Sequence, residues 1–94
     1  MNLNTEQLEQ LEQMGYSLIT PELAAANLEV DELEFRTELG TVGSDVRKAY
    51  YTGYIRQLTE TRQAIIKAAH NGSNPAQLEL LKLINRFQNS LNHV

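Results

Sequence analysis

The chain has 94 residues and a formal net charge of −4, with 41% hydrophobic and 21% charged side chains, which is the composition of one small globular protein. Cysteine is absent, which excludes disulfides, thiolate metal sites and a cysteine nucleophile. The N-terminal residues lack the basic start and apolar run of a signal peptide, and the chain has no 18-residue apolar stretch, so we expect a cytoplasmic protein without a membrane contact.

Helix start and stop signals predict five helices, of which the first three are short. Thr5, Thr20 and Asp31 are residue types that favour N-caps, and a proline follows Thr20 at the first helical position. Gly15 and Gly40 are typical helix ends. The three predicted helices cover about residues 5–15, 20–27 and 32–39.

The fourth predicted helix is the longest, from Asp45 to about Asn71. About 26 helical residues span roughly 40 Å, which is more than the width of a globule of this size. The Asn74-Pro75 pair starts the last helix, and the short connection folds the two helices into an antiparallel αα-hairpin. The sequence therefore predicts an all-α fold, with a head over residues 1–43 and a hairpin over residues 44–94 in one compact unit.

The last helix has an apolar seam. Leu80, Ile84, Phe87 and Leu91 are spaced by four, three and four residues, as in the a and d positions of a coiled coil. Leucines on other sides widen the apolar surface, so we expect one side to face the long helix and the other to be available to a second subunit. A buried Phe87 ring predicts a loss of roughly 3–5 kcal/mol for Phe87→Ala.

The charge is unevenly distributed along the chain. Residues 1–45 contain ten carboxylate side chains and one basic side chain, Arg36, whereas residues 46–94 contain seven basic side chains and two glutamates. Such a dipole favours head-to-tail contacts between subunits or a polyanionic partner. The alternative is that both regions are simply solvated.

Residues 20–39 resemble a helix-turn-helix. Ala25 is small enough for a close helix crossing, and Leu28, Val30 and Phe35 occupy the positions that are buried in this motif, although Glu29 replaces the usual glycine of the turn. The same two-helix corner also occurs as a packing unit without any role in DNA binding. The second helix is acidic, and carboxylates near phosphates lower DNA affinity, so if the protein binds DNA we expect the contacts to come from Arg36, Arg47 and Lys48.

The start of the long helix contains a group of tyrosines. Tyr50, Tyr51 and Tyr54 lie among basic residues, where they can stack on bases, but core or interface packing is the more usual role of such rings. Gly53 has no side chain and therefore allows another helix to approach closely.

Together these segments resemble small terminase subunits of tailed phages and prophages, over about residues 18–90. The resemblance rests on TPELAA at 20–25, the acidic second helix, AYYTG at 49–53, NGS at 71–73 and PA at 75–76. It implies that Arg36 and Thr37 lie on the recognition helix and that a helical hairpin assembles the subunits. It also implies that the protein recognises viral DNA and regulates the large terminase subunit in the bacterial host. The predicted oligomerisation residues are Tyr51, Leu58, Ile65, Leu80, Ile84, Phe87 and Leu91.

Two other functions fit the same sequence. One is a helix-turn-helix transcriptional regulator that binds its operator as a dimer, and the other is a helical interaction adaptor that does not bind DNA. A metal is not expected, because His70 and His93 are far apart and neither has a further ligand at metal-binding spacing. Catalysis and a cofactor are not expected either. The glutamates of the first helix are interpreted as a solvated face.

Overall fold

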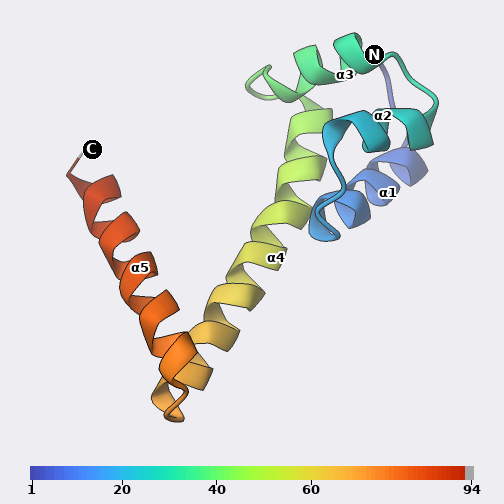
Figure 1. The fold of residues 1–94 in the computed structure, drawn as a ribbon. Helices are drawn as coiled ribbons and strands as arrows, with labels where there is room; N and C mark the ends of the chain where they lie inside the picture. Colours follow the sequence, from blue (N-terminus) through green and yellow to red (C-terminus); the bar gives the residue numbers. More distant parts are fainter. Residues whose placement is uncertain (93–94) are drawn as a thin grey trace. The chain divides into compact units, whose positions relative to one another are not determined.

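The structure, a computed structural model, describes residues 1–92, and in these residues it contains helices and no strands (Figure 1). The predicted all-α fold with a C-terminal helical hairpin is confirmed. The helices are α1 (Thr5–Tyr16), α2 (Pro21–Leu28), α3 (Glu32–Leu39), α4 (Asp45–His70) and α5 (Asn74–Leu91).

The chain forms two compact units, which we call the head unit (Met1–Leu58) and the hairpin unit (from Thr59 onward). The first half of α4 belongs to the head unit, and its second half pairs with α5 in the hairpin unit. The predicted boundary between residues 43 and 44 lies in the connection before α4. The two compact units, however, divide within α4, because its first turns pack against α1 and contribute to the core of the head.

The N-caps of two helices lie one residue earlier than the sequence analysis predicts. Asn4, not Thr5, is the N-cap of α1, and it forms a capping box in which the Gln7 amide donates to Asn4 Oδ1 at 2.8 Å and the Asn4 amide donates to Gln7 Oε1 at 2.9 Å. Ser73 is the N-cap of α5, so that Asn74 is its first residue. Asparagine ranks above threonine at an N-cap, so propensity favours Asn4 over Thr5, whereas serine and asparagine rank equally and propensity does not choose between Ser73 and Asn74.

The predicted two-helix corner of the head is confirmed, with its N-caps at Thr20 and Asp31. α2 continues one residue beyond the predicted end at Asn27, and the chain turns at Glu29, whose φ of 58° and ψ of 42° are left-handed. This is the residue that stands where a helix-turn-helix usually has glycine. A non-glycine residue in this conformation is uncommon, so the turn geometry is imposed by the packing of the two helices rather than by local preference.

The crossing of α1 and α4 depends on two glycines. A Cβ atom placed on Gly15 would lie 2.1 Å from the Tyr50 carbonyl oxygen, and one on Gly53 would lie 1.9 Å from the Glu12 carbonyl oxygen. The prediction that Gly53 admits a neighbouring helix is therefore confirmed, and that helix is α1. The prediction that Gly15 ends α1 is wrong: Gly15 is buried in its last turn, where the missing side chain serves helix packing.

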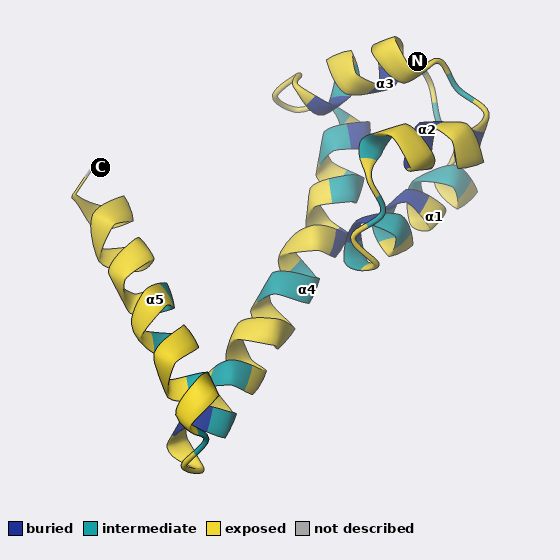
Figure 2. Cartoon of the chain, in the orientation of Figure 1, coloured by how far each residue is buried: buried dark blue, intermediate teal, exposed yellow. Residues whose placement is uncertain are grey.

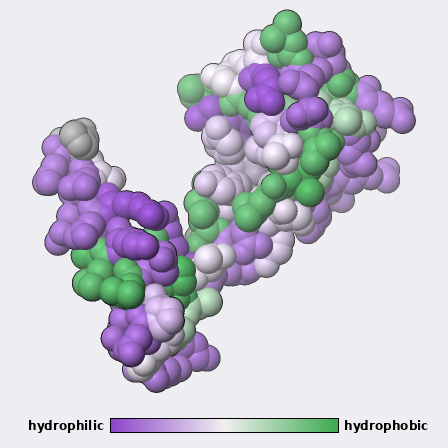
Figure 3. Space-filling view, in the orientation of Figure 1, coloured by the Kyte–Doolittle hydropathy of each residue, from purple (hydrophilic) through white to green (hydrophobic). Residues whose placement is uncertain are grey.

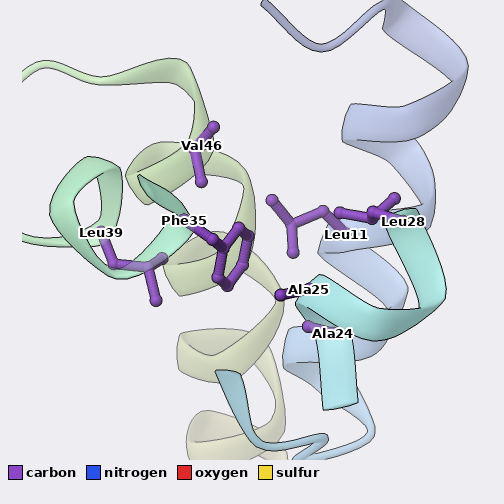
Figure 4. Packing of buried hydrophobic residues seen from close by; sticks show 7 residues of the cluster. All are labelled: Leu11, Ala24, Ala25, Leu28, Phe35, Leu39 and Val46. Atoms are coloured by element: carbon purple, nitrogen blue, oxygen red, sulfur yellow. The ribbon is translucent and has the colours of Figure 1, made fainter. Parts of the chain in front are cut away.

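The hydrophobic core lies within the head unit. Side chains from α1, α2, α3 and the start of α4 point toward one another around the fully buried ring of Phe35 (Figure 4). The small residues Ala24 and Ala25 are also fully enclosed, which allows α2 to approach its neighbours closely. The cluster consists of Leu11, Ala24, Ala25, Leu28, Phe35, Leu39 and Val46.

The hairpin unit has a different burial pattern. Every residue of α5 is at least partly exposed, and the buried residue of the described part of the unit is Ala69, near the end of α4 (Figure 2). Ala69 lies where the hairpin closes, and its carbonyl oxygen accepts a hydrogen bond of 3.1 Å from the Gln77 side-chain amide. The turn is thus held together by polar contacts, whereas most of the apolar surface of α5 is left open to solvent.

Candidate assembly surface

An apolar groove of about 370 Å³ lies in the hairpin unit. Its apolar lining comes from one residue of α4 and several residues of α5, and two arginines, one from each helix, contribute cationic groups. On the face drawn in Figure 3, hydrophobic surface gathers on the α5 segment. The principal lining residues are Arg62, Ile66, Leu80, Ile84, Arg86 and Phe87.

Three of the predicted oligomerisation residues meet in this groove: Leu80, Ile84 and Phe87. The predicted loss of roughly 3–5 kcal/mol on Phe87→Ala required a buried ring. In the single chain the Phe87 side chain is 64% exposed, so this loss is not expected there. Leu91, one helical turn farther along α5, is also exposed. Of the four seam residues, Leu80 is therefore half-buried and the other three are exposed.

The other predicted oligomerisation residues do not join this surface. Ile65 lies on the same segment of α4 as the groove and is half-buried, but it is not part of the groove lining. Leu58 is the last residue of the head unit and is also half-buried. Tyr51 belongs to the head unit, where its ring lies 4.8 Å from the guanidinium carbon of Arg47.

The expected DNA-binding residues of α3 already have partners within the helix. Arg36 donates to the Glu32 carboxylate at 3.0 Å, and the Thr37 hydroxyl donates to the Leu33 carbonyl at 2.9 Å. Glu34 and Glu38 lie within ion-pair distance of the N-terminal ammonium group. The face of α3 that a helix-turn-helix would present to DNA thus has more carboxylates than cations, which disfavours approach to phosphates.

The two basic residues at the start of α4 differ in their environment. The guanidinium of Arg47 donates to the Leu39 carbonyl at 2.7 Å and lies over the Tyr51 ring. It therefore stabilises the C-terminal end of α3. Lys48 lies beside a shallow depression whose lining includes three acidic residues of the head unit. Lys48 is exposed whereas Arg47 is half-buried, but the carboxylates beside Lys48 disfavour the approach of an external anion.

Tyr50 connects the loop after α1 to α4. Its hydroxyl donates to the Ile19 carbonyl, and its ring makes an edge-to-face contact with Phe35 at a centroid distance of 6.2 Å. Burial raises the pKa of Tyr50, with a further increase from neighbouring Tyr51 and an opposing decrease from the positive charge of Arg36. Of the three tyrosines, Tyr50 therefore has the core role that the sequence analysis favoured, while Tyr51 and Tyr54 are exposed.

The sequence analysis missed two features of the surface. It did not consider that Leu33 and Phe35, two positions apart in α3, lie on opposite sides of the helix, so that Phe35 is buried whereas Leu33 is 75% exposed. It also did not single out Arg62 and Arg86, which lie in the groove. The spacing of Arg62 and Ile66, four residues apart on one helix face, is a signal that places this arginine beside apolar surface.

Comparisons with protein-family models, with curated proteins and with solved structures find no match to this chain. In residues 1–92 no helix is long and apolar enough to span a bilayer, and no group of three or more potential ligands is placed to hold a metal ion. His93, one of the two histidines considered above, lies outside the described residues.

Proposed function

We propose that this protein is a self-assembling helical protein of the small-terminase type, in which subunits associate through the hairpin unit and carry helix-turn-helix-like heads. The observation that carries this proposal is the open seam of α5. Ile84, Phe87 and Leu91 are spaced as in a coiled coil, yet all three are exposed in the single chain. An amphipathic surface of this kind is normally covered by another polypeptide.

The small size of the protein supports the same conclusion. The buried cluster is confined to the head unit, and the described part of the hairpin unit buries one small hydrophobic residue, Ala69. A two-helix hairpin with so little enclosed apolar surface gains little free energy from its own packing. Association of several chains buries the exposed leucines, isoleucine and phenylalanine and stabilises the hairpin at the same time.

The test is the mass in solution at micromolar concentration, measured by light scattering. The proposal predicts an oligomer for the wild-type chain and a marked loss of mass for Phe87→Asp. Asn89→Asp is the matched control, because it adds the same charge to α5 on the side opposite to Phe87, where the residues three and four positions earlier, Arg86 and Asn85, are polar. A stable monomer at all accessible concentrations, or an oligomer that both variants leave unchanged, contradicts assembly through this seam.

The DNA-related part of the proposal depends on assembly. A single head has an acidic α3 and few available cations, so the proposed contact with viral DNA requires several heads acting together, which raises affinity through effective concentration. Electrophoretic mobility of a DNA fragment at low salt tests this, with Arg36→Ala and Lys48→Ala as variants. A mobility that the oligomer does not change favours the adaptor function over DNA packaging or transcriptional regulation. A large terminase subunit is the protein partner that the small-terminase type implies.

A further inference from the structure

We propose that the exposed face of α3 in one subunit docks into the apolar groove of the hairpin unit of a second copy, with Leu33 as the inserted side chain. This inference rests on the proposed function, because it requires that the chain self-associates. It goes beyond that function by naming the surface that fills the groove, the exposed face of α3 in the head unit. The contact is therefore head-to-tail, between the head unit of one copy and the hairpin unit of the next.

The head presents an apolar residue in acidic surroundings. Leu33 is more exposed than any other hydrophobic side chain of α3, and it sits beside Glu32 and four positions after Glu29. Arg36 pairs with Glu32 at 3.0 Å, and the N-terminal ammonium group lies 3.3 Å from the Glu34 carboxylate. The five carboxylates on and next to α3 nevertheless outnumber these two cations. This combination is poorly suited to a phosphate backbone, and it is suited to a partner that is both apolar and cationic.

The groove of the hairpin unit has the complementary character. Ile66, Ile84 and Phe87 provide an apolar lining, and Arg62 and Arg86 contribute guanidinium groups from the two helices. An inserted leucine side chain replaces water in contact with the Phe87 ring and the isoleucines. Guanidinium groups bind carboxylates with defined geometry, so they can fix the orientation of an acidic helix in the groove.

The distribution of charge along the chain favours a second copy as the occupant. The ten carboxylates of residues 1–45 belong to the head unit, whereas in the described part of the hairpin unit basic side chains outnumber acidic ones. The same chain therefore carries both halves of a complementary pair. A contact between two different surfaces is heterologous, and it generates a closed ring or an open filament rather than an isologous dimer.

The experiment uses two full-length variants, Leu33→Asp and Phe87→Asp, alone and mixed. Each variant is expected to lose the oligomeric mass of the wild type, because one lacks the inserted residue and the other lacks a usable groove. An equimolar mixture is expected to form a 1:1 dimer, because the intact groove of the Leu33→Asp chain accepts the intact head of the Phe87→Asp chain. Leu23→Asp, which places the same charge at an exposed leucine of α2, is the control and retains the wild-type mass.

The outcomes separate the two proposals. If the wild-type chain is monomeric, the proposed self-assembly fails, and the docking fails with it. If the wild type is oligomeric and Leu33→Asp keeps the same mass, the head-to-tail contact is overturned while assembly through the hairpin stands. Circular dichroism verifies that each variant folds, which we expect because both substituted side chains are exposed and aspartate suits the first turn of α3.

Discussion

The crossing of α1 and α4 predicts that Gly53→Ala destabilises the protein. In the present backbone the added methyl carbon would lie 1.9 Å from the Glu12 carbonyl oxygen and 2.7 Å from the Tyr16 backbone nitrogen. Both atoms belong to the main chain of α1, so the overlap cannot be relieved by the rotation of a side chain. α1 has to move away from α4, which loosens its packing against the rest of the core.

The magnitude follows from two opposing effects. Alanine is favoured over glycine within a helix by about 1 kcal/mol, whereas overpacking of a well-packed contact costs about 1–3 kcal/mol and occasionally more. Because the clash at Gly53 is with backbone, we take the upper part of this range and expect a net loss of roughly 2 kcal/mol. For a unit of this size that corresponds to a melting temperature lower by roughly 10 °C.

Thermal unfolding followed by circular dichroism at one fixed protein concentration measures this effect, since association also raises the apparent melting temperature. Gly40→Ala is the matched control: Gly40 has a φ of −84°, and the nearest atom to its added Cβ would be the Thr37 carbonyl oxygen at 3.6 Å. We expect this variant to melt at or slightly above the wild-type temperature. A Gly53→Ala protein that melts as high as the wild type would refute the close crossing.

Three further predictions concern the core, the loop after α1 and the first helix. Phe35→Ala should lower the free energy of unfolding in urea by about 3–5 kcal/mol, and a loss no larger than that of Phe87→Ala in a monomeric background would contradict the buried position of Phe35. Tyr50→Phe should lower the free energy of unfolding by about 1 kcal/mol through the lost hydrogen bond to Ile19. Because the pKa of Tyr50 is raised above its ordinary value of 10.0, the stability that the protonated hydroxyl contributes is complete below that pH and is lost as the pH rises through the folded-state pKa. Ionisation of Tyr50 should therefore destabilise the wild type at alkaline pH, whereas Tyr50→Phe should not show this loss. Asn4→Ala should lower stability by about 1 kcal/mol in the same urea titration, and an unchanged midpoint would show that the capping box contributes nothing.

The sequence by itself determined the helical class and most element boundaries. Caps, prolines and glycines act through local backbone geometry, so the corner at Thr20 and Asp31 and the hairpin turn before Pro75 could be predicted from single residues and their neighbours. The four-three-four spacing placed Leu80, Ile84 and Phe87 on one side of α5, because helical periodicity is itself a local property.

Only the tertiary structure decided what each surface packs against. The role of Gly15 as a contact rather than a helix end depends on Tyr50 of α4, which lies 35 residues farther along the chain. The engagement of Arg47 with the end of α3 likewise depends on a contact between two elements. Most of all, the exposure of Leu33 and of Phe87 depends on which helix faces are enclosed; local patterns mark a residue as apolar, but the arrangement of the whole chain determines whether the chain itself or a partner covers it.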